Sequence, residues 1–146
     1  MKATAYSINV DEKEHLVRSN AKTHDLTLIS NALNASTLPY CAGKTVIIVS
    51  GTDVLGKSLL ISLKQMGVKH VITRSKSTAH IDLASAAELG IKVANNPSDD
   101  QSIENTAKQT IHNLDLWEAG RCVGRACCCH DCNSTNKRDT EGNLTK

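Results

Sequence analysis

The sequence predicts an α/β fold with a doubly wound parallel sheet, and three observations support this. Strand-like apolar runs alternate with helical patterns along most of the chain, which is typical of successive βαβ units. The run Thr45–Val49 is continuous and β-branched, as expected for a strand buried on both faces of a parallel sheet. Phe is absent, so the core must be built from Ile, Leu, Val and Ala. We therefore predict a flavodoxin-like sheet of five strands in the order 2-1-3-4-5, with helices on both faces.

The first third of the chain predicts two strands around one helix. Residues 1–8 form the first strand, and the spacing of Asp11 and Glu14 is that of a capping box, which starts a helix reaching Lys22. A short strand, Leu26–Ile29, follows. Residues 31–43 contain a proline and predict an irregular connection with about one helical turn.

The remaining pattern is sharper after the Thr45–Val49 strand. Leucines at helical spacing predict a helix from Asp53 to Met66, with Gly67 as its C-terminal stop. A last helix should follow a capping box at Ser98 and Gln101, bury one face including Trp117, and end at Gly120. Between these two helices, the predicted elements are a strand at His70–Arg74, a helix at Asp82–Leu89 and a strand at Ile91–Ala94.

Charge and composition exclude several classes of protein. Residues 1–120 hold equal numbers of acidic and basic residues, and rings suitable for stacking on bases are almost absent, so no nucleic-acid surface is expected. No apolar run is long enough to span a bilayer, and the first residues lack the apolar stretch of a secretory signal. We therefore predict a cytoplasmic protein without membrane contact. Residues 1–120 form the predicted domain, and residues 121–146 form a Cys-rich, mostly disordered tail.

The loop after the His70–Arg74 strand is the predicted binding site. It carries two cations and three hydroxyl groups in five residues, at the end of a strand where α/β proteins bind ligands. These side chains suit an anion; the alternative is an ordinary solvated turn. The predicted site residues are Arg74, Ser75, Lys76, Ser77 and Thr78.

A second motif matches the phosphate-binding P-loop pattern between a strand and a helix. Its pattern residues are Gly51, Gly56, Lys57 and Ser58, of which Lys57 would contact phosphates and Ser58 a magnesium ion. Against this reading, Asp53 places a negative charge where phosphates would lie. The alternative is a helix capped by Thr52 or Asp53, with no nucleotide bound.

The tail could supply soft ligands to a zinc ion. The candidate ligands are Cys127, Cys129, His130 and Cys132, although only Cys129 and Cys132 form a C-x-x-C unit and no second such pair follows. A reduced, flexible tail is the alternative. Cys41, which is far from the other cysteines, is predicted to be a small buried or half-buried apolar residue.

Residues 67–97, GVKHVITRSKSTAHIDLASAAELGIKVANNP, resemble a segment of the D-isomer-specific 2-hydroxyacid dehydrogenases, the D-lactate dehydrogenase group. The opening residues, MKATAYSINVDEKE, are similar to the start of these enzymes, and residues 102–121, SIENTAKQTIHNLDLWEAGR, are similar to their C-terminal helix. The resemblance implies their flavodoxin-like substrate-binding domain. It also implies that backbone amides at Lys76 and Ser77 hold the substrate carboxylate.

The resemblance further implies that dehydrogenase chemistry depends on residues outside this sequence. Full-length members carry an NAD-binding Rossmann domain between the two similar parts, and their catalytic Arg, Glu and His lie in it. The sequence has no G-x-G-x-x-G motif, so we expect no cofactor bound by this chain alone. We expect a standalone substrate-binding-type domain, inactive by itself, that binds a small 2-oxo or 2-hydroxy acid weakly. The alternatives are a P-loop nucleotide binder at Gly51–Ser58 and a module that self-associates through the surface left by the absent NAD domain.

Overall fold

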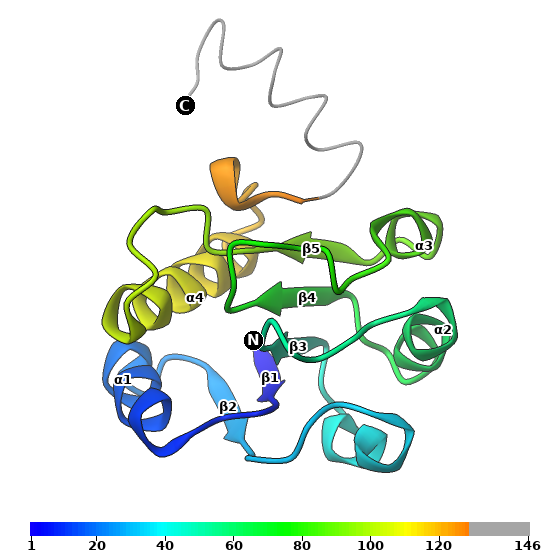
Figure 1. The fold of residues 1–146 in the computed structure, drawn as a ribbon, viewed down its shortest axis with the longest axis horizontal. Coiled ribbons are helices and arrows are strands. Elements are labelled where there is room, and N and C mark those ends of the chain that lie inside the picture. Colours follow the sequence, from blue (N-terminus) through cyan, green and yellow to red (C-terminus); the bar gives the residue numbers. More distant parts are fainter. Residues whose placement is uncertain (129–146) are drawn as a thin grey trace, which may run out of the picture.

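The computed structural model describes residues 1–128 and contains a parallel five-stranded sheet in the order β2-β1-β3-β4-β5 (Figure 1). The strands are Lys2–Ala5 (β1), Asp25–Leu28 (β2), Val46–Val49 (β3), His70–Thr73 (β4) and Lys92–Ala94 (β5). The helices are Val10–Asn20 (α1), Lys57–Gln65 (α2), Leu83–Glu88 (α3) and Ile103–Glu118 (α4), with 3-10 helices at Ala35–Cys41 (η1) and Gly124–Ala126 (η2). The predicted fold class and strand order are confirmed.

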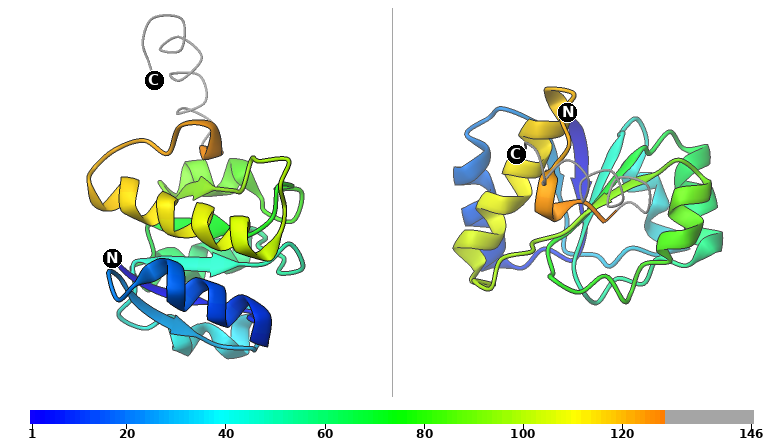
Figure 2. Two further views of the ribbon diagram at one scale, coloured as in Figure 1. Left: turned by 90° about the vertical axis from the view of Figure 1, so that its left-hand side faces the viewer. Right: turned by 90° about the horizontal axis from the view of Figure 1, so that it is seen from above.

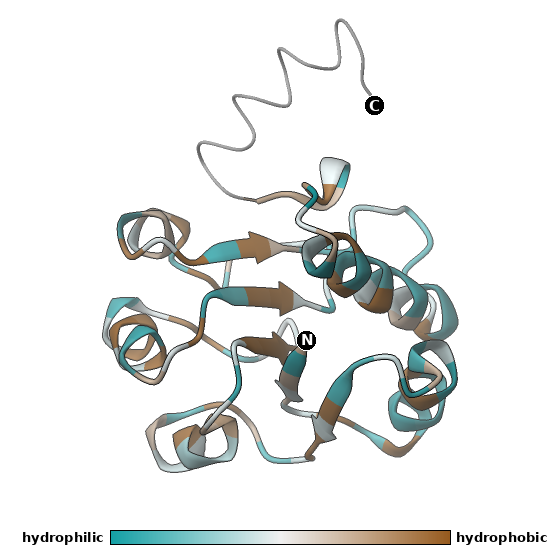
Figure 3. Ribbon diagram, turned by 180° about the vertical axis from the view of Figure 1, so that it is seen from behind, coloured by the Kyte–Doolittle hydropathy of each residue, from teal (hydrophilic) through white to brown (hydrophobic). Residues whose placement is uncertain are grey.

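Helices cover both faces of the sheet. α1 and α4 lie side by side on one face, and α2 and α3 cover the other (Figure 2). The side chains of β3 alternate between the two layers, with Val46 and Ile48 facing α1 and α4, and Ile47 and Val49 facing α2. All four are fully buried, and the apolar colouring of β3, β4 and β5 in Figure 3 follows from this double coverage.

The last helix packs back on the sheet as its periodicity predicts. Ala107, Ile111, Leu114 and Trp117 are buried at helical spacing in the core beneath α1 and α4. The Trp117 ring packs against His70, with 4.3 Å between ring centroids, and burial lowers the pKa of His70 to about 4. α4 has 16 residues, and within residues 1–128 no helix combines the length and apolar character needed to cross a membrane.

Two helix starts differ from the prediction. α1 is capped by Asn9, which accepts from the Glu12 amide at 2.8 Å, while Asn9 N donates to Glu12 Oε1 at 3.3 Å; the predicted pair Asp11 and Glu14 is therefore wrong. The spacing of a capping box occurs twice, at Asn9 and Glu12 and at Asp11 and Glu14. The contact of Glu12 with the loop after β4, described below, favours the first pair. At α4 the cap is Ser102, because the Gln101 side chain turns back to the backbone carbonyl of Ser98 instead.

The helix after β3 also starts later than predicted. α2 begins at Lys57, with Gly56 as its N-cap and no side chain hydrogen-bonded to the cap. Neither Thr52 nor Asp53 caps it. The segment between β3 and α2 instead turns at Gly51 and Thr52, and Leu55 then forms a parallel bridge with Ile81, just before α3.

The connection after β2 is more ordered than predicted. It contains η1, which Asn34 caps with a reciprocal pair of hydrogen bonds to Thr37. The Tyr6 hydroxyl donates to the Thr37 carbonyl at 2.9 Å, which fastens the connection to the sheet. Cys41, at its end, is fully buried, which confirms the prediction.

The fold extends past the predicted boundary at residue 120. Ala94 and Cys127 form an antiparallel bridge, and Asn95 N and Cys128 N donate to backbone carbonyls across it. Val123, Ala126 and Cys127 are buried in the core under α4. Of the predicted tail, residues 121–146, the part from residue 129 onwards lies outside the described residues, and its predicted disorder stays a prediction.

Candidate functional site

The predicted anion-binding loop, residues 74–78, leaves the carboxyl end of β4 between the segments that follow β3 and β5 (Figure 1). A Cβ at Gly51, after β3, would lie only 3.2 Å from Ser75 Cβ, so the two segments are in close contact. On the other side, Asn95 and Asn96 hydrogen-bond to the loop backbone. The loop is therefore held between its neighbours at the edge where α/β sheets bind ligands.

Three successive carbonyl groups of this loop are held by donors of the protein. The Ser75 carbonyl accepts from the Asn96 amide at 3.1 Å. The Lys76 carbonyl accepts from Asn95 Nδ2 at 2.7 Å, and the Ser77 carbonyl accepts from the Ser75 hydroxyl at 2.8 Å. The orientation of all three peptide units is thereby fixed.

The amide N–H groups of the same peptide units, at Lys76, Ser77 and Thr78, point the other way. The peptides are trans, and in a trans peptide the N–H and C=O groups point in opposite directions. None of these three amides donates to an acceptor within residues 1–128. Ser77 does not adopt a positive φ, so a serine takes this conformation without the strain that would favour glycine. The loop thus offers three backbone donors.

Arg74, the first residue of the loop, is buried. Its side chain is 3% exposed, and its Nε donates to Glu12 Oε2 at 2.8 Å, while Nη2 donates to the Ser7 carbonyl at 3.0 Å. Nη1 is buried and has no partner among the described residues. The charge of Arg74 is therefore largely satisfied by Glu12 and fixes the loop to α1, and direct contact of Arg74 with a ligand stays a prediction.

Lys76 extends over the surface to the segment after β5. Its ammonium group lies 2.8 Å from Asp99 Oδ1, and both side chains are well exposed. The hydrogen bond and charge of Lys76 lower the pKa of Asp99 below its usual value. This ion pair competes with any anion for Lys76, so the backbone amides are the donors best placed to bind one.

The P-loop-like segment is shaped by an internal carboxylate. Asp53 is 2% exposed and accepts from the Ser7 hydroxyl at 2.8 Å, the Leu33 amide at 3.1 Å and the Ser50 amide at 3.0 Å. A protein carboxylate, and not an open phosphate cradle, therefore lies within the segment that carries the pattern residues Gly51, Gly56, Lys57 and Ser58. Since a phosphate would have to replace this charge, the arrangement disfavours nucleotide binding there.

The residues that the sequence did not mark as site members are Asn95 and His80. Asn95 anchors the Lys76 carbonyl, and His80 Nε2 lies 3.0 Å from Thr73 Oγ1 beneath the loop. Burial lowers the pKa of His80 below its usual value, and the charge of Asp53 opposes this shift. The position of Asn95 in the sequence could have identified it as a site residue. It is the first residue after β5, so it lies at the carboxyl ends of the strands, as the loop does.

The predicted metal ligands fall mostly outside the described residues. Cys129, His130 and Cys132 lie there, while Cys127 is buried against the sheet. Within residues 1–128, no group of three or more His, Cys, Asp or Glu residues is arranged to hold a metal ion.

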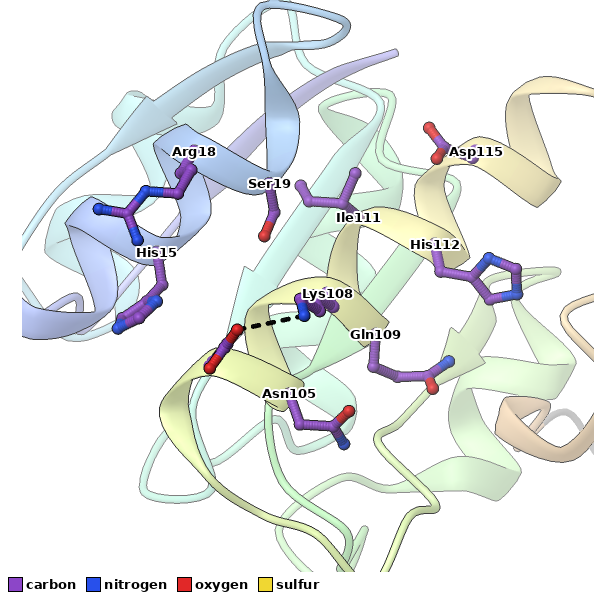
Figure 4. A pocket seen from close by; sticks show the side chains of 10 residues that line it. His15, Arg18, Ser19, Asn105, Lys108, Gln109, Ile111, His112 and Asp115 are labelled. Carbon is purple, nitrogen blue, oxygen red and sulfur yellow. Dashed lines mark ion pairs between the residues drawn. The ribbon is translucent and has the colours of Figure 1, made fainter.

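A groove of about 650 Å³ runs between α1 and α4, on the face of the sheet that these two helices cover (Figure 4). It is lined by polar side chains, but its cations are matched by acids one helical turn away. Lys108 pairs with Glu104 at 3.1 Å and Arg18 pairs with Glu14 at 2.7 Å. Such i,i+4 pairs are typical of a solvated helix surface, so the groove adds no candidate site.

Residues 5–126 match the family model described as D-isomer specific 2-hydroxyacid dehydrogenase, catalytic domain. An aromatic 2-oxoacid reductase from Clostridium sporogenes is 31% identical over 99 residues, which cover 67% of this chain and 30% of that protein. A D-specific alpha-keto acid dehydrogenase from Enterococcus faecalis is 36% identical over 67 residues, covering 46% of this chain and 21% of the relative.

A similar solved structure is the apo-structure of D-lactate dehydrogenase from Escherichia coli. It superposes with a TM-score of 0.66 at 29% identity, over 68% of this chain and 32% of that chain. The match thus spans between about a fifth and a third of the length of these three proteins.

Proposed function

Because the chain belongs to the D-isomer specific 2-hydroxyacid dehydrogenase family, we propose that the loop after β4 binds the carboxylate of a small 2-oxo or 2-hydroxy acid. The observation that carries this proposal is the row of three anchored peptide units, whose N–H groups at Lys76, Ser77 and Thr78 have no acceptor within residues 1–128. Backbone amides are good donors to carboxylates, because the hydrogen bonds are strengthened by the charge.

The electrostatics of the loop support a small monoanion. Glu12 offsets the charge of Arg74, and Asp99 offsets that of Lys76, so the loop has little net positive charge. Binding would therefore depend mainly on oriented dipoles, and we expect it to be weak.

Hydride transfer is not proposed for these residues. A nicotinamide cofactor would need a glycine-rich turn whose backbone approaches the pyrophosphate, and no G-x-G-x-x-G motif is present in the sequence. The turn after β3, the nearest equivalent by position, is arranged around the Asp53 carboxylate. The residues present do not fit NAD. We propose that any dehydrogenase activity requires an NAD-binding domain in addition to this one.

The experiment that tests carboxylate binding is an amide NMR titration of the protein with pyruvate. Shifts should be largest at Lys76, Ser77 and Thr78, whose N–H groups would gain an acceptor. NADH and Mg-ATP, added separately, serve as comparisons, and shifts at Gly51–Ser58 with Mg-ATP would favour the nucleotide alternative. A well-dispersed spectrum that pyruvate leaves unchanged would disprove the proposal.

A pair of variants at Ser77 tests the role of the backbone. Ser77→Pro removes the amide N–H, and we expect pyruvate affinity to fall by about ten- to a hundredfold, the effect of losing one hydrogen bond to a charged group. Ser77→Ala keeps the N–H and should bind pyruvate nearly as the unmodified protein does. Equal affinities for the two variants, both folded by circular dichroism, would show that this amide is not a ligand.

Self-association is a second candidate function, favoured by exposed apolar side chains near the carboxyl edge of the sheet. Val10 at the start of α1, Val54 after β3 and Ile103 at the start of α4 are 84%, 70% and 40% exposed. We propose that these residues form a contact surface for a second copy of this chain. Sedimentation velocity over a range of protein concentrations tests this: a rising sedimentation coefficient that Val54→Ser abolishes would support it, and an invariant monomer would contradict it.

A further inference from the structure

A continuous chain of polar side chains lies under the loop. Thr73, the last residue of β4, is 1% exposed, and its Oγ1 lies 2.6 Å from Ser75 Oγ and 3.0 Å from His80 Nε2. Ser75 Oγ in turn lies 2.8 Å from the Ser77 carbonyl. The chain therefore runs from His80 through Thr73 and Ser75 to one of the anchored peptide units.

The direction of every hydrogen bond in this chain follows from counting protons. The Ser77 carbonyl can only accept, so the single hydroxyl proton of Ser75 is donated to it. Ser75 Oγ must then accept from Thr73, whose only proton is used in that contact. Thr73 Oγ1 has no proton left for His80.

The remaining contact of Thr73 defines the state of the imidazole. Because Thr73 Oγ1 can only accept from His80, the ring must carry a proton on Nε2. Thr73 Oγ1 also lies 3.4 Å from the Ser75 amide, a weak second donor, so both of its lone pairs face donors. The reverse direction would place the Ser75 and Ser77 oxygens 2.8 Å apart without a proton between them.

We propose that His80, as the Nε2–H tautomer, is a positioning residue that orients the Ser77–Thr78 peptide unit for anion binding. The backbone from which the His80 ring projects is fixed, because the His80 carbonyl accepts from the Leu55 amide at 2.8 Å. This chain of hydrogen bonds directs the Ser77 carbonyl toward the Ser75 hydroxyl, and the Thr78 N–H therefore points away from it. The part of this inference that concerns binding rests on the proposed carboxylate site, but the tautomer does not.

The ring nitrogens of His80 report the tautomer directly. In the ligand-free protein labelled with 15N, at a pH at which the ring is neutral, Nε2 should show the shift of a protonated ring nitrogen and Nδ1 that of an unprotonated one. The opposite assignment, or an average of the two, would overturn the inference whether or not any acid binds.

Two variants of similar size test what the donor does. Gln at position 80 can donate from its side-chain amide, whereas Met cannot donate. His80→Gln should keep pyruvate affinity within about twofold, and His80→Met should lower it by roughly two- to tenfold, as expected for one neutral hydrogen bond. Equal pyruvate affinities of the two variants would contradict a positioning role. If the unmodified protein binds no pyruvate, the proposed function fails, while the ring nitrogens still decide the tautomer.

Discussion

Replacing Glu12 with alanine should destabilise the protein by about 3 kcal/mol, among the larger effects of any single substitution, because it leaves the buried charge of Arg74 without an acidic partner, with the Ser7 carbonyl as its remaining acceptor. The Glu12 side chain is 18% exposed and that of Arg74 is 3% exposed, so little water can replace the lost carboxylate. Glu12 also completes the capping box of α1, so its loss should fray the start of that helix as well. The measurement is the free energy of unfolding in urea.

Glu14→Ala is the matched control for this prediction. Glu14 lies on the same helix and pairs with Arg18 at 2.7 Å, but both side chains are more than half exposed, so the loss should be below about 0.5 kcal/mol. If the two variants were equally stable, the ion pair between α1 and the loop would contribute no more than a surface pair does.

Replacing Asp53 with alanine should also destabilise the protein by about 3 kcal/mol, because the buried Leu33 amide and the Ser7 hydroxyl would lose their acceptor. Asp53→Asn should have a smaller effect, because its remaining side-chain oxygen still accepts hydrogen bonds. Some loss is still expected, because its amide nitrogen would face donors of the protein. Thermal unfolding followed by circular dichroism gives the ranking. Asp99→Asn, at a fully exposed carboxylate, is the control that should leave the transition unchanged. A transition of Asp53→Ala as high as that of the control would show that these hydrogen bonds are replaced by water.

The sheet could be predicted from the sequence because alternating strands and helices joined by right-handed crossovers leave few arrangements open. The helix starts could not be predicted as well. Asn9 with Glu12 and Asp11 with Glu14 have equivalent spacing, and the choice between them depends on Arg74, which is 62 residues from Glu12 in the sequence. A local motif cannot reveal a partner at that distance.

The position of the candidate site could likewise be predicted, but residue types alone did not indicate the donors that the structure leaves open; only the family resemblance pointed to the amides of Lys76 and Ser77. Residue types suggested the side chains of Arg74 and Lys76, whereas the structure pairs both of them with carboxylates and leaves backbone amides open. Backbone orientation depends on anchors such as Asn95 and His80, which come from other segments. The pairing of Cys127 with Ala94 was also missed, since a single bridge has no periodicity to detect.

The segment that crosses β5 has a practical consequence for dissecting this protein. An outer strand with open backbone groups is a template on which another chain can add, and folded proteins commonly shield such strands. Residues 126–128 shield β5 in this way, with Asn95 N bonded to the Ala126 carbonyl and Cys128 N to the Val93 carbonyl. A version cut at residue 120 would uncover that strand and become prone to strand-to-strand aggregation. Aggregation of such a truncated protein would therefore result from the loss of residues 126–128, and it would not indicate a natural binding partner.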